Sequence, residues 1–146
     1  MLYADDLSPG QEFVFGTWTM TQQDIIDYAR QWDPLPIHID IAAAAAGPHG
    51  GIIASGLHTL AIYQRLLVDA FWKNVHAVGG RNFQLSFKRP VRPGMTLSGH
   101  ARIDRIEHRP ERGNAVLYLV SQLTDDNNQV VFDIAADAAI LRRPSA

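Results

Sequence analysis

Apolar and polar residues change their spacing along the chain, from a helical period in the first half to strand-like alternation in the second. Residues 11–20, QEFVFGTWTM, are aromatic and β-branched and follow turn residues, which predicts a strand. Thr21 then stands three residues before Asp24, an acidic variant of the capping box. This pair predicts that a helix begins directly after the strand.

The predicted helix after Thr21 is short and amphipathic. It ends near Trp32, because Pro34 disfavours helical geometry at Asp33. The stretch that follows is therefore expected to be a loop leaving a helix. The apolar residues recur at helical spacing and can share one face: Ile25, Ile26, Tyr28, Ala29 and Trp32.

Two further helices are predicted before the middle of the chain. Residues 40–47 form a short one, with Asp40 as its N-cap and Gly47 at its end. Residues 47–56 are glycine-rich and are expected to be irregular. A long helix then begins at Ser55 and is apolar around most of its circumference, which predicts burial on more than one side. Its apolar residues are Leu57, Leu60, Ala61, Tyr63, Leu66, Leu67, Ala70 and Phe71.

The second half reads as four long strands, at residues 82–91, 95–109, 115–125 and 129–141. The turn signals RPG, ERGN and DDNN separate them, which predicts an antiparallel sheet. One strand, two short helical pieces, a long helix and four strands make an α+β order. A single domain with an antiparallel sheet wrapped around a long central helix fits this order, and that arrangement is the hot-dog fold.

Composition narrows the class of protein. The 146 residues suit one domain, and 47% hydrophobic with 19% charged residues describes a globular chain. A net charge of −2 without a Lys/Arg run argues against nucleic acid as the partner. Cysteine is absent, which excludes disulfides and thiol chemistry. We find no signal-peptide pattern and no apolar run of ~20 residues, and we expect a cytoplasmic protein that does not enter a membrane.

The stretch WDPLPIHID, residues 32–40, carries the first candidate chemistry. Pro34 and Pro36 each fix their own φ angle at about −65° and stiffen the segment between Asp33 and His38. A carboxylate and an imidazole that converge on one point can bind a water and move its proton. The alternative is structural: Asp33 caps a turn, and His38 is a packed, hydrogen-bonded residue.

The glycine-rich segment before the long helix carries the second candidate chemistry. Gly56 lies in the first helical turn, where backbone N–H groups have no intrahelical acceptor and the helix dipole is positive. A carbonyl bound there would be polarised as in an oxyanion hole, which contributes ~3 kcal/mol per donor. The alternative is that Gly56 only allows close packing of helix and sheet.

Three segments together resemble the MaoC-like dehydratase family, which includes the (R)-specific enoyl-CoA hydratases. They are DPLPIHID, GGIIASGLHTLAIYQRLL and FKRPVRPGMTL. The family motif of Asp, Pro, an apolar residue and His is matched by Asp33, Pro36, Ile37 and His38. Gly56 stands at the position of the family glycine whose amide holds the thioester oxygen. The resemblance extends from about Phe13 to Ile140.

This resemblance implies a hot-dog homodimer that binds a fatty-acyl thioester of coenzyme A or acyl carrier protein. The implied reaction adds water to a 2-enoyl thioester or removes it from the (R)-3-hydroxyacyl product. Asp33 would be the general base, His38 would orient the water and help deliver the proton, and Gly56 would hold the developing charge. No cofactor besides the thioester substrate and no metal is expected. The expected substrate-binding residues are Ser55, Leu57, His58 and Arg92.

Two positions depart from the family pattern. Leu35 replaces the usual Asn or Gln, and Trp32 replaces a glycine, which puts substrate range and rate in doubt. Lys88, Arg89 and Arg92 could meet coenzyme A phosphates or form a solvated turn. Two other functions stay open besides hydration: a hot-dog thioesterase, and a non-catalytic subunit that binds acyl thioesters.

Overall fold

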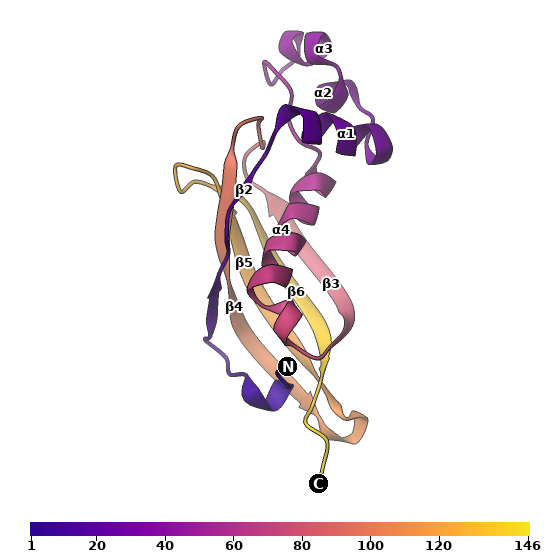
Figure 1. Cartoon of the computed structure of the whole chain (residues 1–146), viewed down its shortest axis with the longest axis vertical. Helices are drawn as coiled ribbons and strands as arrows, with labels where there is room; N and C mark the ends of the chain where they lie inside the picture. The colour runs from indigo at the N-terminus through magenta and orange to yellow at the C-terminus, as the bar shows by residue number, and fades with distance from the viewer.

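The computed structural model describes residues 1–146 and shows an antiparallel sheet curved around one long helix (Figure 1). The strand order is β1–β4–β5–β6–β3, and β2 pairs separately with β4. The helices are α1 (Gln22–Trp32), α2 (Pro36–Ile39), α3 (Ile41–Ala46) and α4 (Gly56–Ala70). The strands are β1 (Glu12–Val14), β2 (Trp18–Thr19), β3 (Ala77–Phe87), β4 (Thr96–Arg109), β5 (Asn114–Thr124) and β6 (Val130–Leu141). Short 3₁₀ turns cover Ala4–Asp6, Trp72–Asn74 and Pro110–Arg112. The predicted α+β hot-dog arrangement is confirmed.

The single strand predicted for residues 11–20 is divided in two. β1 pairs with Arg102 to His100 of β4, whereas β2 pairs with Leu97 and Thr96. Between these pairings, Gly99 has a φ of +153°, and a side chain there would overlap the backbone of β5. The two short strands therefore pair with β4 on either side of Gly99.

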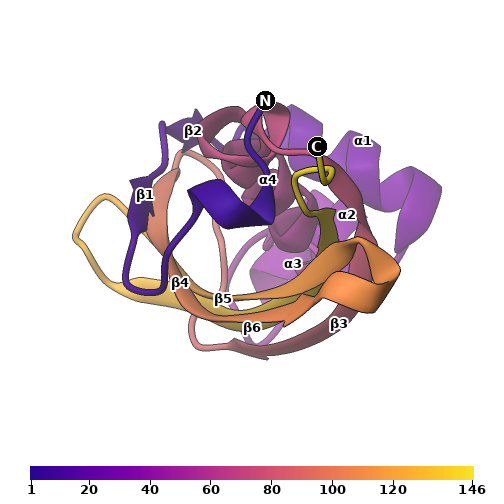
Figure 2. The same ribbon diagram turned by 90° about the horizontal axis from the view of Figure 1, so that it is seen from below.

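The concave face of the sheet holds α4 and the hydrophobic core (Figure 2). Tyr63, in the middle of α4, is fully buried, and its hydroxyl lies 3.1 Å from Ser121 Oγ of β5. Burial raises the pKa of the Tyr63 hydroxyl, because the phenolate would lose its hydration. This hydrogen bond ties the helix to the sheet at the centre of the core.

One flank of α4 is left uncovered. β3 is the edge strand beside it, and Phe83 and Phe87 of β3 are each 56% exposed. Leu57 of α4 is 53% exposed, so the predicted burial of the apolar residues of α4 is wrong for this one. Trp32, predicted on the apolar face of α1, is 62% exposed, and that prediction is also wrong.

The three short helices lie beyond the N-terminal end of α4, above the open end of the sheet (Figure 1). The stretch predicted as a loop after Trp32 contains α2, which begins at Pro36. Proline suits this first helical position, since its missing N–H has no intrahelical partner there. No helix of the protein combines the length and the apolar character that crossing a membrane requires.

Candidate active site

Asp33 closes α1 and begins the segment that carries the predicted chemistry. Its backbone N–H donates to Ala29 O at 2.8 Å, and its own φ of −157° has left the helix, as Pro34 requires. Its side chain is 28% exposed. The carboxylate is therefore held at a helix end with partial access to solvent.

His38 lies on α2 and its ring is held by one defined hydrogen bond. Nδ1 lies 2.7 Å from Ile53 O, and a carbonyl can only accept, so Nδ1 carries the hydrogen. Nε2 is then the nitrogen that exchanges protons with the site, and it lies 3.4 Å from Asp33 Oδ2. The side chain is only 6% exposed. The structure therefore brings Asp33 and His38 together, as the sequence predicts.

Ser55 joins this pair to α4. Its hydroxyl donates to Asp33 Oδ2 at 2.7 Å and accepts from the backbone N–H of Leu57 at 3.2 Å. Ser55 is fully buried and is the N-cap of α4, as the sequence predicts. The sequence gives no sign of its bond to Asp33, because 22 residues separate the two.

Gly56, the first residue of α4, leaves its backbone N–H without a hydrogen bond inside the protein. The ring of Phe87 lies against it: a Cβ added to Gly56 would stand 2.5 Å from the tip of that ring. Glycine is therefore required for the close approach of β3 to the helix end. The free N–H also meets the electrostatic requirement for an oxyanion donor.

A cavity of about 330 Å³ opens at this end of the fold. His38 and Gly56 line it, whereas Asp33 does not line it and is linked to it only by the 3.4 Å contact with His38. Lys88 and Arg89, directly after the end of β3, also line it. His49 and a set of apolar and small side chains complete the wall, the latter being Ile53, Ala54, Thr59, Phe87, Pro90 and Val91.

A second, apolar groove of about 570 Å³ runs along the uncovered flank of α4. Leu57 and Leu60 line it from the helix, and Phe83 lines it from β3. Gly79 and Gly80 of β3 form part of the wall, where the absence of side chains leaves room. Strand alternation in β3 could have predicted that Phe83 faces the helix; its exposure depends on β3 being an edge strand.

His58 and Arg92, also predicted to bind substrate, are not among the residues that line the cavity. His58 is 5% exposed, stacks on Tyr28 of α1 with ring centroids 4.4 Å apart, and lines neither pocket. Its Nδ1 has no hydrogen-bond partner. Burial lowers the pKa of His58, and the nearby Asp24 carboxylate opposes that effect. Arg92 donates from Nη1 to His49 O at 2.8 Å.

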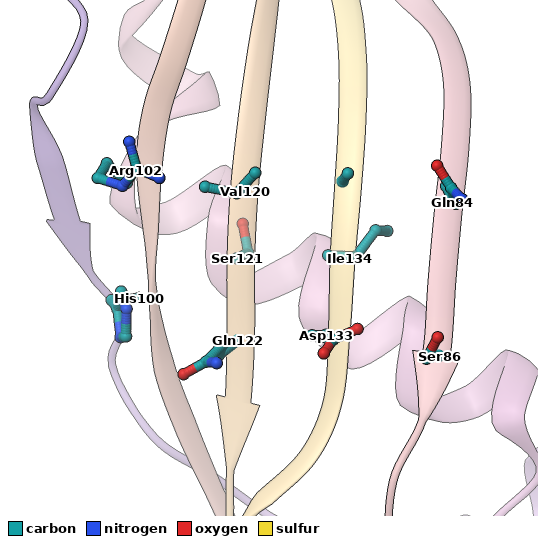
Figure 3. A pocket seen from close by; sticks show the side chains of 10 residues that line it. Gln84, Ser86, His100, Arg102, Val120, Ser121, Gln122, Asp133 and Ile134 are labelled. Atoms are coloured by element: carbon teal, nitrogen blue, oxygen red, sulfur yellow. The ribbon is translucent and has the colours of Figure 1, made fainter.

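A third depression of about 500 Å³ lies on the outer face of the sheet, with α4 behind the strands (Figure 3). His100 and Arg102 project into it from β4, and Asp133 projects from β6. The charged groups are already paired: Arg102 lies 3.4 Å from Asp104, and Asp133 lies 3.8 Å from Lys88. This surface is a largely polar sheet face, separate from the groups that contact His38. The structure holds no cluster of three or more His, Asp or Glu side chains arranged to bind a metal ion.

Known proteins supply an independent comparison. The family model described as "MaoC like domain" matches residues 6–122. The uncharacterized protein YdeM of Bacillus subtilis is 28% identical over 127 residues, which cover 86% of this chain and 89% of that protein. The crystal structure of a MaoC-like dehydratase from Rhodospirillum rubrum superposes with a TM-score of 0.90, at 30% identity, over 99% of this chain and 100% of that one.

A more distant structure shows how far the fold is shared. R-hydratase PhaJ1 from Pseudomonas aeruginosa superposes with a TM-score of 0.75 at 18% identity, over 97% of this chain and 86% of that chain. That likeness concerns the fold alone. The family model covers most of the chain, from the first 3₁₀ turn into β5. The chain therefore belongs to the MaoC-like domain family of hot-dog proteins.

Proposed function

We propose that the protein is a hydratase/dehydratase that adds water to a 2-enoyl thioester and, in reverse, removes it from the (R)-3-hydroxyacyl thioester. The observation that carries the proposal is the convergence of Asp33, His38 and the free N–H of Gly56 at one end of α4. His38 and Gly56 line one cavity, and the Asp33 carboxylate contacts the imidazole of His38, so a base, an imidazole and a donor suited to an oxyanion lie near one another. Membership of the MaoC-like family, which includes hydratases, supports the same reaction class.

The hydrogen-bond directions explain how a water would be oriented. With the hydrogen of His38 on Nδ1, the Nε2 of the neutral ring is an acceptor, as is the Asp33 carboxylate. A water between them donates both of its hydrogens, so an oxygen lone pair is left to attack C3. Asp33 takes one proton, and the C–O bond forms at C3 as the C2–C3 double bond opens.

The charge created at C2 delocalises onto the thioester oxygen. The Gly56 N–H stabilises it there, a contribution of ~3 kcal/mol in comparable sites. The proton that Asp33 took from the water then passes to His38 Nε2, 3.4 Å from Asp33 Oδ2, and from there to C2, so that the net change is one H on C2 and one OH on C3. No cofactor takes part in these steps, and the thioester is the substrate.

Two features outside the reacting groups support an acyl thioester as the substrate. The apolar groove along α4 starts beside Gly56, at Leu57, and offers a surface for an acyl chain. Lys88 and Arg89 line the cavity at its other side and could pair with the phosphates of coenzyme A or of a carrier protein's prosthetic group. Arg92 supports that region from its bond to His49.

We also propose that the protein works in the cytoplasm as a homodimer formed through β3. β3 is an edge strand with unpaired backbone groups, and nearly all of its residues are exposed. Phe83, Phe87 and Leu57 together expose apolar surface on the same flank. Pairing of β3 with β3 of a second copy would extend the sheet and cover these side chains.

The test is the loss of enoyl-thioester absorbance with crotonyl-CoA and with longer trans-2-enoyl-CoAs, with His38→Ala as the inactive control. Hydration by the wild type that collapses in folded His38→Ala is the expected result, and the series gives the acyl length. Release of free coenzyme A, detected with a thiol reagent, would instead identify a thioesterase. Binding without turnover at every chain length would rule out the hydratase and leave a non-catalytic subunit.

A further inference from the structure

Ser55 connects the two halves of the candidate site through a single hydroxyl group. It donates to Asp33 Oδ2 at 2.7 Å and accepts from Leu57 N–H at 3.2 Å. We propose that Ser55 is a positioning residue, whose hydroxyl leaves Oδ1 of Asp33 as the base oxygen and fixes that carboxylate relative to the Gly56 amide. The inference rests on the proposed hydration and assigns a role within it.

The direction of both hydrogen bonds follows from chemistry. A serine hydroxyl has one hydrogen to give, and an ionised carboxylate can only accept. Because the Leu57 N–H already donates to Oγ, the hydroxyl hydrogen is available for Asp33. Ser55 is fully buried, so water does not compete for this bond, and bonds to an ionised group are about twice as strong as neutral ones.

The two oxygens of Asp33 are made unequal by this contact. Oδ2 accepts from Ser55 and lies 3.4 Å from His38 Nε2. Oδ1 accepts no hydrogen bond in the protein. The lone pairs of Oδ1 are therefore free to take a proton from water, whereas those of Oδ2 are engaged.

The same hydroxyl sets the distance from the base to the oxyanion donor. Ser55 and Gly56 are consecutive, and both lie at the rigid first turn of α4. Asp33 belongs to a different element, at the end of α1. Deprotonation of the water that attacks C3 and charge stabilisation at the thioester oxygen require both groups in fixed relation to one substrate, because misplacement by about 1 Å can cost 10²-fold in rate. The Ser55 bond provides that relation.

Ordinary helix capping does not account for the bond to Asp33. Thr21 caps α1 by accepting from Asp24 N–H at 3.1 Å, and it makes no contact with the site. Thr21→Ala therefore removes a comparable cap and nothing else. It is a matched control that separates a loss of helix stability from a loss of carboxylate position.

The experiment compares steady-state hydration by the wild type, Ser55→Ala, Ser55→Thr and Thr21→Ala, with melting temperatures for each. We expect Ser55→Ala to lower kcat roughly 10- to 100-fold, with KM within about threefold, as for the loss of a hydrogen bond to a charged group. Ser55→Thr keeps the hydroxyl and should restore most of kcat. Thr21→Ala should show a similar fall in melting temperature with wild-type kcat.

A double-mutant cycle supplies a readout that a structural role would not move. If Ser55 acts through Asp33, then Ser55→Ala adds nothing to the loss caused by Asp33→Asn. Should Ser55→Ala fail to fold, Ser55→Cys, whose thiol is a weak donor, takes its place. A kcat within twofold of wild type, an equal loss in Thr21→Ala, or additive losses in the cycle would overturn the inference alone. A wild type inactive on every enoyl thioester would overturn the proposed function, and this inference with it.

Discussion

The two regions beside α4 differ in how completely one chain builds them. At its N-terminal end, His38, Asp33 and Ser55 are linked by hydrogen bonds or close contacts, and their side chains are largely buried. Along its flank, Phe83 and Leu57 are more than half exposed beside an unpaired strand edge. The first region has its internal partners in place, and the second does not.

The difference suggests separate roles for the two regions: the helix end carries the reacting groups, and the flank binds an acyl chain or a second copy. Reacting groups must be held to within about 0.5 Å, and the hydrogen bonds among α1, α2 and α4 can do this within one chain. An apolar groove needs only to exclude water, and a second copy or an acyl chain can complete it. We therefore expect mutations at the helix end to change turnover without changing assembly, and mutations on the flank to change assembly first.

Asp33→Asn should have the largest effect, because it removes the proposed base without changing the size of the side chain. We expect kcat to fall up to about 10⁴-fold, the upper range for general base catalysis. The dimer and the melting temperature should stay close to wild type, since Asn can still accept from Ser55. Initial rates of enoyl-thioester hydration, measured beside size-exclusion chromatography with light scattering, check both. Loss of the dimer in this variant would contradict the separation of the two regions.

Phe83→Asp should have the next largest effect, and on assembly. Each proposed dimer would lose two buried phenylalanines at about 1.5–3 kcal/mol each and gain two charges there. We expect the dimer Kd to rise at least about 100-fold, measured by light scattering on dilution. Val14→Asp is the matched control: Val14 is 80% exposed on β1, at the opposite edge of the sheet, and its variant should remain dimeric. Monomers from both variants, or from neither, would show that β3 is not the interface.

The sequence predicts the order of elements and the pairing of Asp33 with His38, because both depend on local signals. Pro34 ends α1, Asp40 caps α3, and Ser55 caps α4, each from a side chain or ring acting within a few residues. The bond from Ser55 to Asp33 and the contact of Phe87 with Gly56 depend on how separate elements pack. A single sequence contains no local pattern for either contact.

The wrong predictions share a physical cause. Trp32 and Leu57 lie at positions where helical periodicity predicts burial, yet both are exposed. Periodicity reports which face is apolar and says nothing about what covers it. The substrate-binding predictions for His58 and Arg92 stay predictions, and they rested on nearness in sequence to the glycine and the turn. In the structure, His58 packs on Tyr28, and Arg92 holds the backbone of His49.

Gly56→Ala tests the packing at the point where the two regions meet. A new Cβ would stand 2.5 Å from the tip of the Phe87 ring, and because that ring is 56% exposed and can turn outward, the cost should be about 1 kcal/mol, the low end for overpacking. We expect a lower free energy of unfolding in urea, together with reduced kcat, because the ring and the helix end must move apart. Adding Phe87→Leu should restore the stability lost to the clash. If Gly56→Ala is as stable as wild type, the close approach of Phe87 is not a constraint on the site.

His58 should give the smallest effect, and one confined to mildly acidic pH. Burial lowers its pKa below the ordinary 6.5, so the folded protein binds this proton less readily than the unfolded chain does. As pH falls through about 6.5, the unfolded chain gains a proton that the folded one lacks, and the free energy of unfolding decreases; above that range the effect is absent. His58→Phe keeps the stacking on Tyr28 and should reduce the loss of stability between pH 7.5 and 5.5 by about 1 kcal/mol or less. The exposed His108, changed to Gln, is the control that should leave the slope unchanged. An unchanged slope in His58→Phe would mean that the ring is hydrated in solution, and that α1 is held against α4 less closely than the stack implies.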